Sequence, residues 1–105
     1  MLFTKEKHEN LRGGKGIVTT YTVPIRRPFK NYSIGKFIIL SLAPNSSVGM
    51  HKHVSDSEIY VTFSWHIRFN GKKRWALINR CKRGNSHSAV NTSNQKKALI
   101  FAFKY

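Results

Sequence analysis

Three histidines and one glutamate have the types and spacing of a metal site. His51 and His53 lie two apart in H-K-H-V-S-D-S-E, Glu58 follows five positions after His53, and His87 lies in R-G-N-S-H-S. Imidazole nitrogens together with a carboxylate oxygen suit Mn, Fe, Ni, Cu or Zn better than Mg or Ca. The chain holds only four acidic residues, and one of them stands beside the histidine pair. The sequence therefore points to a site for a divalent transition metal.

The site depends on extended segments that aim these side chains the same way. On a strand, His51 and His53 point to one face because side chains alternate. The V-S-D-S turn allows Glu58, at the start of the next strand, to fold back beside the pair. His87 follows the tight turn R-G-N-S at the start of another strand. Taken singly, each of these features has a simpler explanation. An H-x-H pair is more often two solvent-exposed polar residues, Glu58 could be an ordinary salt-bridge partner, and His87 could be a loop histidine.

The rest of the sequence favours short strands over helices. Runs rich in β-branched and aromatic residues alternate with Gly, Pro, Asn and Ser clusters, and Asn70-Gly71 is a strong hairpin signal. Helical periodicity with caps is missing, although residues 5–11 could make a turn or two of helix. We predict strands at 17–24, 37–43, 58–64, 66–69, 74–78, 87–91 and 98–103. Their number in about 100 residues favours an all-β sandwich or small barrel.

Length and composition limit the class of protein. With 105 residues, 40% of them hydrophobic, the chain is expected to form one domain with one core. No apolar run approaches the roughly 18–20 residues of a membrane span, and the first residues lack the apolar region of a signal peptide. A single cysteine, Cys81, fits a reducing compartment, so we expect a cytoplasmic protein without membrane contact.

The net charge is the unusual quantity. Nineteen Lys and Arg against four acids give +15, and ten basic residues but no acid follow Glu58. Such a charge attracts anionic ligands or polyanions, although lysines can also simply solvate outward strand faces. Basic and aromatic residues alternate in residues 68–75, as on a nucleic-acid-binding face. We favour instead a basic hairpin whose aromatic rings point inward.

Two segments resemble the paired motifs of the cupin family. The first motif, G-x5-H-x-H-x(3,4)-E-x6-G, aligns with residues 45–65, and the second, G-x5-P-x-G-x2-H-x3-N, aligns with residues 76–91. The opening L-R-G-G-K-G and the segment L-A-P-N-S-S-V-G are also similar to small single-domain cupins of the conserved cupin-2 barrel type. The resemblance covers about residues 11–103. Six positions match the motifs in register: His51, His53, Glu58, Gly84, His87 and Asn91.

The resemblance implies a single cupin domain over 1–105, with an N-terminal segment at 1–15 and a β-barrel (double-stranded β-helix, or jelly roll) at about 16–104. It implies a metal held by His51, His53, Glu58 and His87. The scaffold departs from the pattern where Asn45, Trp65 and Ala76 replace glycines and Lys82 replaces the turn proline. Asn45 can still adopt a left-handed conformation. Unusual turns or shifted registers are expected near Trp65 and Ala76.

Two further side chains are candidates for acid–base chemistry in the cavity. Strand alternation places Tyr60 on the same side as Glu58, and His66 lies a few residues further along. Cys81 precedes His87 by six positions, but no second cysteine supports a thiolate site, so a packed residue is expected.

The sequence leaves the reaction open. Our leading hypothesis is a metal-binding cupin for a small, anionic metabolite such as a phosphorylated sugar or a carboxylate. In an enzymatic form, the metal polarises a carbonyl or activates oxygen, as in the isomerases and dioxygenases of similar proteins. The alternatives are a non-enzymatic ligand-binding or sensor barrel and, less favoured, a basic nucleic-acid-associated protein. Similar small cupins are often dimers, so a homodimer is also expected from the resemblance.

Overall fold

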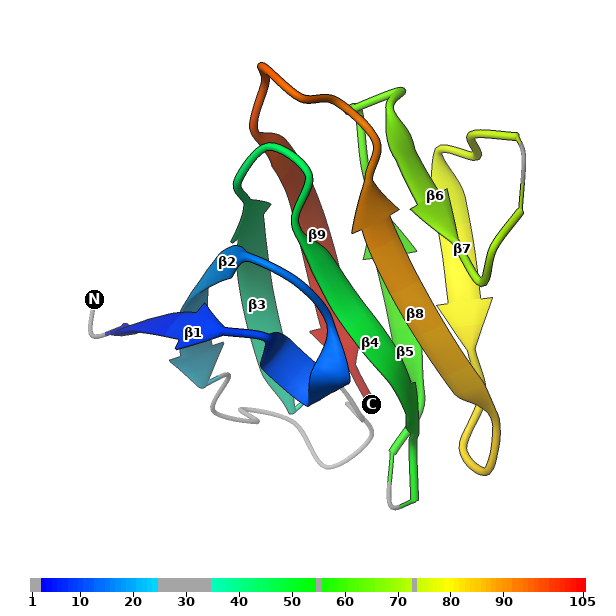
Figure 1. Cartoon of the computed structure of the whole chain (residues 1–105). Helices are drawn as coiled ribbons and strands as arrows, with labels where there is room; N and C mark the ends of the chain where they lie inside the picture. Colours follow the sequence, from blue (N-terminus) through cyan, green and yellow to red (C-terminus); the bar gives the residue numbers. More distant parts are fainter. Residues whose placement is uncertain (1–2, 25–34, 55, 73) are drawn as a thin grey trace.

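The computed structural model describes residues 3–24, 35–54, 56–72 and 74–105, and almost all of its regular structure is β. Two antiparallel sheets face each other (Figure 1). The six-stranded sheet has the order β1-β2-β3-β9-β5-β7, and the three-stranded sheet has the order β4-β8-β6. The elements are β1 (Thr4–Glu9), η1 (Leu11–Gly13), β2 (Ile17–Pro24), β3 (Lys36–Leu42), β4 (Ser47–Lys52), β5 (Glu58–Val61), β6 (Ile67–Phe69), β7 (Ile78–Cys81), β8 (Ser86–Asn91) and β9 (Ala98–Lys104).

The all-β prediction is confirmed, and most predicted strands lie within a residue or two of the observed ones. The strand predicted at 74–78 is wrong, because β7 begins only at Ile78. The strand predicted at 58–64 ends early, at Val61. Residues 5–9, offered as part of a helical turn, belong instead to β1. None of the described residues forms a helix long and apolar enough to span a membrane.

The turn at Asn70-Gly71 forms but does not make a hairpin. Both residues have a positive φ, 55° and 69°, as a tight turn of the mirror-image type requires. However, β6 pairs with β8 and β7 pairs with β5, so the two strands that flank this loop belong to different sheets. The turn signal is local, whereas strand pairing is decided by the packing of the two sheets.

Strand alternation fills the space between the sheets. In β9, Ala98, Ile100 and Ala102 are buried, and the residues between them point outward. The same alternation in β3 and β5 turns Leu42 and Tyr60 inward. β1 lies within the predicted N-terminal segment 1–15 and pairs with β2 along its whole length. The domain boundaries themselves stay a prediction.

A β-bulge in β4 aims the first motif inward. Val48 pairs with Ala89 and His51 pairs with His87, so three steps along β4 match two steps along β8. The extra residue lets both Val48 and His51 face the interior, which strict alternation forbids. Gly49 lies in this bulge, and a Cβ there would be 2.1 Å from the backbone oxygen of Arg12. A glycine is therefore required where η1 packs on β4.

Asn91, the last motif residue, joins three backbone segments. Its buried side-chain amide donates to the carbonyls of Leu42, Ala43 and Lys96 at 3.2, 3.1 and 2.8 Å. Its side-chain oxygen accepts the Ser93 amide at 3.0 Å. These bonds connect the end of β8 to the β3–β4 turn, where Asn45 has the left-handed φ of 59° expected for a glycine substitute.

We predict that Asn91→Ala lowers the free energy of unfolding by about 2–3 kcal/mol, because buried carbonyls lose their donor and cannot reach water. Chemical denaturation of the metal-free protein measures this. Asn94→Ala is the control, because Asn94 is exposed, and its effect should stay within about 0.5 kcal/mol. Equal stability of the two variants would contradict a structural role for Asn91.

Candidate metal centre

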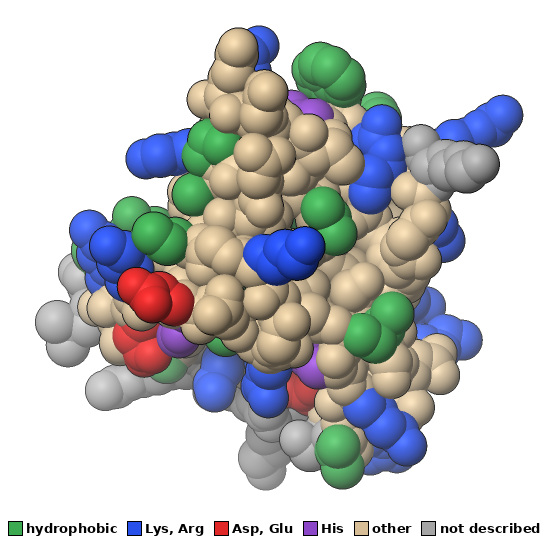
Figure 2. All heavy atoms as spheres, in the orientation of Figure 1, with side chains coloured by type: hydrophobic (Ala, Val, Ile, Leu, Met, Phe, Trp, Pro, Cys, Tyr) green, Lys and Arg blue, Asp and Glu red, His purple; other side chains and the backbone are tan. Residues whose placement is uncertain are grey.

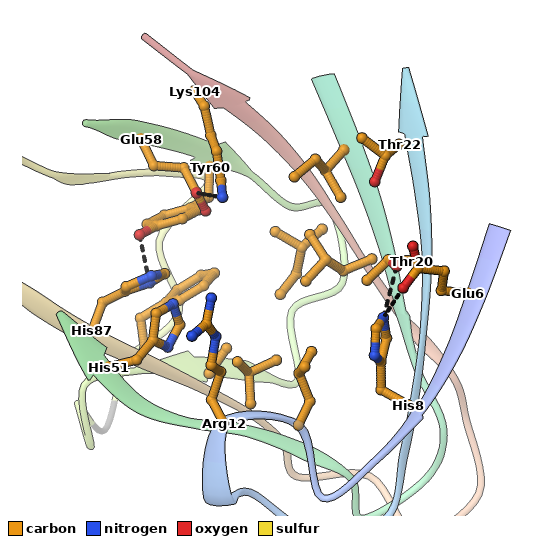
Figure 3. A pocket seen from close by; sticks show the side chains of 17 residues that line it. Glu6, His8, Arg12, Thr20, Thr22, His51, Glu58, Tyr60, His87 and Lys104 are labelled. Atoms are coloured by element: carbon orange, nitrogen blue, oxygen red, sulfur yellow. Dashed lines mark hydrogen bonds and ion pairs between the residues drawn. The ribbon is translucent and has the colours of Figure 1, made fainter. Parts of the chain in front are cut away.

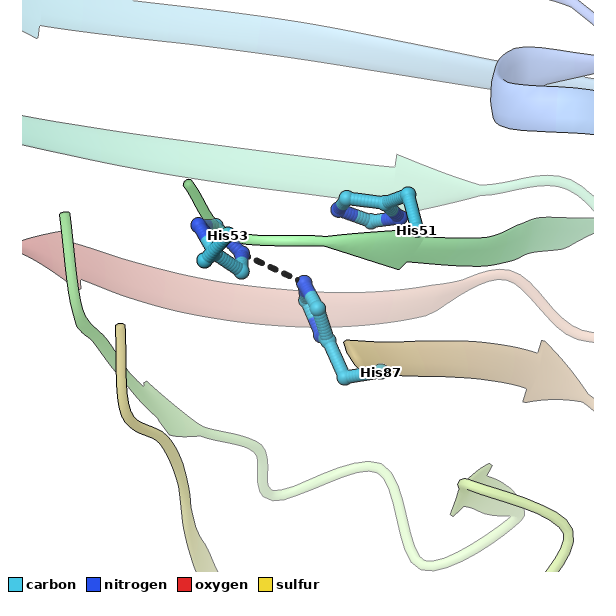
Figure 4. A group of neighbouring side chains, drawn as sticks. All are labelled: His51, His53 and His87. Carbon is cyan, nitrogen blue, oxygen red and sulfur yellow. Dashed lines mark hydrogen bonds between the residues drawn. The ribbon is translucent and has the colours of Figure 1, made fainter. Parts of the chain in front are cut away.

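Three histidines from two strands converge between the sheets (Figure 4). His51 lies on β4, His53 directly follows it, and His87 lies on β8. One potential ligand atom from each lies within 4.8 Å of the others. The Nε2 atoms of His53 and His87 are 2.6 Å apart. His53 and His87 are buried, with 6% of each exposed, so the cluster is withdrawn from bulk water.

Each imidazole is oriented by a partner on its other nitrogen. His51 Nδ1 donates to the carbonyl of Gly49 at 2.9 Å, and His53 Nδ1 donates to the Asp56 carboxylate at 2.7 Å. His87 Nδ1 is hydrogen-bonded to the Tyr60 hydroxyl. Every Nε2 is thereby left as the atom available to a metal, the arrangement in which outer partners fix the tautomer of metal-binding histidines.

The bond between His53 and His87 shows where a cation fits. Because His53 donates from Nδ1, its Nε2 is an acceptor, and His87 must supply the proton between them. That proton stands where two imidazole lone pairs converge. A metal ion would take its place, and the Tyr60 hydroxyl can then accept from His87 Nδ1 instead of donating. The donor set therefore fits a divalent transition metal.

Glu58 lies at the edge of this cluster. It is 5% exposed at the start of β5, and its Oε2 is 3.5 Å from His53 Nε2 and 3.9 Å from Lys104 Nζ. The structure thus brings the predicted carboxylate next to the histidines, although only the three histidines form the tight group. Lys104, on the neighbouring strand β9, pairs with Glu58 in the sheet register.

Burial disfavours charge on the groups of this site. It lowers the pKa of His87 to about 3, with further lowering by His51 and His53. The pKa of His51 is also lowered, mainly by burial. The hydrogen bond to Gly49 opposes this shift, and the positive charge of Arg12 adds to it. Burial raises the pKa of Glu58 despite the opposing effect of Lys104. Both histidines are therefore held neutral, the form that binds metals.

A cavity of about 240 Å³ opens from the histidines between the sheets (Figure 3). His51, His87, Glu58 and Tyr60 line one end, and Arg12 and Lys104 add two positive charges there. Tyr60 is buried, and its pKa is raised, first by burial and then by Glu58. Its hydroxyl therefore remains protonated and serves as the hydrogen-bond partner of His87.

The other acid–base candidate, His66, lies elsewhere. It does not line the cavity, and its Nε2 is hydrogen-bonded to the carbonyl of Lys97 at 3.2 Å. Two residues at the site were not assigned from the sequence. Asp56 orients His53 through a hydrogen bond. Its position in a turn three residues after His53 is the sequence feature that could have indicated this contact. Arg12 enters the cavity from the L-R-G-G-K-G turn, and no sequence signal indicates where that turn packs.

The basic side chains on the face seen in Figure 2 are spread out. In Figure 2, Lys and Arg side chains are scattered over the visible face among polar and apolar atoms, without a single basic groove. Among the residues expected to make a nucleic-acid face, Phe69 is buried and stacks on Tyr60. Arg68 donates to the carbonyls of Trp65 and Ile67 at 2.6 and 2.9 Å. Lys73 lies outside the described residues.

The fold and the histidine site together define a cupin barrel, and the chain belongs to the cupin superfamily. An oxalate-binding protein of Thermotoga maritima is 35% identical over an alignment of 96 residues that covers 87% of this chain and 78% of that protein. The crystal structure of a predicted oxalate decarboxylase from Thermotoga maritima has a TM-score of 0.76 and 30% identity, over 97% of this chain and 91% of that one.

A cupin-2 conserved barrel domain protein from Salinispora arenicola shares the fold alone, with a TM-score of 0.58 and 18% identity over 82% of this chain and 75% of that one. No protein-family model matches the chain. The resemblance inferred from the two motifs is therefore confirmed by the relatives and by the structure.

We predict that Glu58→Gln raises the free energy of unfolding of the metal-free protein at neutral pH. A carboxyl whose pKa is raised on folding binds more protons in the folded state, so ionised Glu58 destabilises the fold above that pKa. The difference from the parent protein should shrink as the pH falls and Glu58 becomes protonated. Urea denaturation at several pH values measures it.

Glu9→Gln, an exposed carboxylate on β1, serves as the control and should change little. A Glu58→Gln variant less stable than the parent at neutral pH would show that the contacts of Glu58 with Lys104 and His53 outweigh the burial of its charge.

Proposed function

We propose that this cupin binds one divalent transition metal through His51, His53, His87 and Glu58, and that the metal holds a small carboxylate metabolite of the oxalate class. The observation that carries the proposal is the orientation of the histidines, since all three have Nδ1 engaged and Nε2 available. Glu58 would complete the set as an oxygen ligand beside His53. Mn, Fe, Ni, Zn and Cu all suit such donors.

The positive charges at the metal end of the cavity support an anionic ligand. Arg12 lines the cavity, and among the described residues its guanidinium has no hydrogen-bond or ion-pair partner. Figure 3 shows it pointing toward His51. Its backbone has a left-handed φ of 55°, a conformation that costs a non-glycine residue energy and that often marks functional positions. A free guanidinium beside a metal matches the planar geometry of a carboxylate.

The similar protein of Thermotoga maritima is an oxalate-binding protein, which supports the same ligand class here. When bound, the metal would supply Lewis-acid polarisation of the carboxylate. Tyr60 would keep His87 oriented, and Arg12 would bind the part of the anion that is turned away from the metal. Binding is the function best supported. Catalysis by Tyr60 or His66, isomerase-like or dioxygenase-like turnover, cytoplasmic location and a homodimer all stay predictions.

We predict that the purified or metal-reconstituted protein contains about one metal ion per chain, and that His51→Ala/His53→Ala loses it. Asp56→Asn should keep the site but weaken metal binding by roughly 10- to 100-fold, because the carboxylate that orients His53 is lost. Elemental analysis and competition with a metal indicator measure both effects.

The matched control is Glu9→Gln, which removes the same charge from an exposed position. A parent protein that stays without metal after reconstitution with each of the five ions would disprove the proposed metal centre.

We predict that Arg12→Gln lowers the affinity of the metal-loaded protein for oxalate by about 10-fold or more, since a charge-assisted hydrogen bond is worth about 1.5–3 kcal/mol. The metal content should not change. Calorimetric titration measures the affinity. Arg83→Gln removes the same charge from a turn that does not line the cavity, and it should bind oxalate like the parent. Equal losses in the two variants would mean that only the overall charge matters.

A further inference from the structure

The cavity extends well beyond the metal end. Its other end is formed by the inward faces of β1 and β2, where Glu6, His8, Thr20 and Thr22 line it. Figure 3 shows this second polar group across the cavity from His51, His87 and Arg12, with apolar side chains between the two. None of these four residues contributes to the histidine cluster or contacts Glu58.

The strand register places both ends on one inner face of the six-stranded sheet. Neighbouring residues in one row of this face run from β1 to β9: Glu6, Thr20, Leu40 and Ile100. The next row runs from β2 to β5: Thr22, Ile38, Ala102 and Tyr60. The first row is polar on β1 and β2, and the second is polar on β2. Both rows are apolar on β3 and β9, and the second row ends at a polar residue on β5. This face therefore has two polar ends separated by an apolar middle.

The far end has its own hydrogen-bonding groups. His8 Nε2 is 3.0 Å from Thr20 Oγ1 and 3.8 Å from Glu6 Oε2. Glu6 is one of only four acids in a chain with nineteen Lys and Arg; alternation along β1 places it on the cavity side, opposite Lys5 and Lys7, with 59% of its side chain still exposed. Glu6 therefore gives this end of the cavity a negatively charged acceptor.

The separation of the ends is larger than a two-carbon anion can span. Strands lie about 4.8 Å apart, so the three steps from β5 to β2 follow roughly 14 Å of sheet. The cavity of about 240 Å³ is lined by residues of both ends, so it also extends well past the metal end. A ligand the size of oxalate, held at the metal, would leave the far group without a partner.

We propose that the cavity takes an elongated monocarboxylate: the carboxylate binds at the metal, an apolar chain lies over Ile38 and Leu40, and a terminal hydroxyl bonds to Glu6 and Thr20. This inference rests on the proposed function and extends it to a substrate class. A hydroxyl fits because it both donates to Glu6 and accepts from its neighbours. A second carboxylate would meet the charge of Glu6, and a terminal ammonium is disfavoured by a net charge of +15.

The test uses the full-length, metal-loaded protein and calorimetric titration with linear acids of four, six and eight carbons. At each length, the unsubstituted acid, its ω-hydroxy form and the dicarboxylate are compared, with oxalate as the short reference. We expect the ω-hydroxyl to improve affinity by about 5- to 10-fold at the best-fitting length, as a hydrogen bond to a charged acceptor near solvent would. The dicarboxylate should be weaker than the hydroxy acid.

Two variants locate the effect. Glu6→Ala and Thr20→Val should remove the advantage of the hydroxyl and leave the unsubstituted acids unchanged. Glu9→Ala is the matched control, since Glu9 lies on the same strand and does not line the cavity. Metal content, measured for each variant, reports whether the barrel is folded.

The outcomes separate this inference from the proposed function. If oxalate binds but the ω-hydroxyl has no effect at any length, the far end is only a solvated rim, and this inference fails while the proposed function stands. A preference that survives in both variants, or a dicarboxylate that binds best, also overturns it. If neither oxalate nor any other acid binds the metal-loaded protein, the proposed function fails as well.

Discussion

One extra residue in β4 decides which way the H-x-H pair points. Without the bulge between Val48 and His51, a core-facing Val48 would turn His51 toward solvent. The bulge is held where η1 crosses β4, because Gly49 lets the backbone of Arg12 approach. The same contact places Arg12 at the cavity. The inward direction of His51, the bulge and the position of Arg12 are therefore consequences of one backbone packing, and the Gly49 carbonyl also orients His51.

The site concentrates the few acids of a basic chain. Asp56 is hydrogen-bonded to His53, Glu58 lies beside the histidines, and Glu6 lines the far end of the cavity. Burying Glu58 is unfavourable in itself, as its raised pKa shows, and Lys104 offsets this only in part. Such costs are typical of functional sites, where a buried charge is kept for chemistry and not for stability.

The sequence predicted which polar side chains lie close together better than it predicted the scaffold. Ligand positions depend on residue type and local alternation, which are legible along the chain, so His51, His53, Glu58 and His87 could be grouped and Tyr60 placed beside Glu58. β7 was predicted four residues too early, because the segment after Asn70-Gly71 looked like a hairpin arm, whereas its pairing belongs to the other sheet. β1 was missed because T-K-E-K-H-E is polar on both faces. Arg12 and Glu6 reach the cavity only through long-range pairing, which no local pattern encodes.

The charges also connect the proposed metal binding with the proposed anion binding. The metal end of the cavity contains Arg12 and Lys104, but Lys104 is already paired with Glu58. Without a metal, Lys104 and Glu58 offset each other, and Arg12 alone supplies the excess positive charge for an anion. A divalent ion held by the histidines and Glu58 would add to this positive charge at the metal end of the cavity. In the proposed function, the affinity for a carboxylate would therefore be coupled to metal binding, and by thermodynamic reciprocity the carboxylate would tighten the hold on the metal by the same factor.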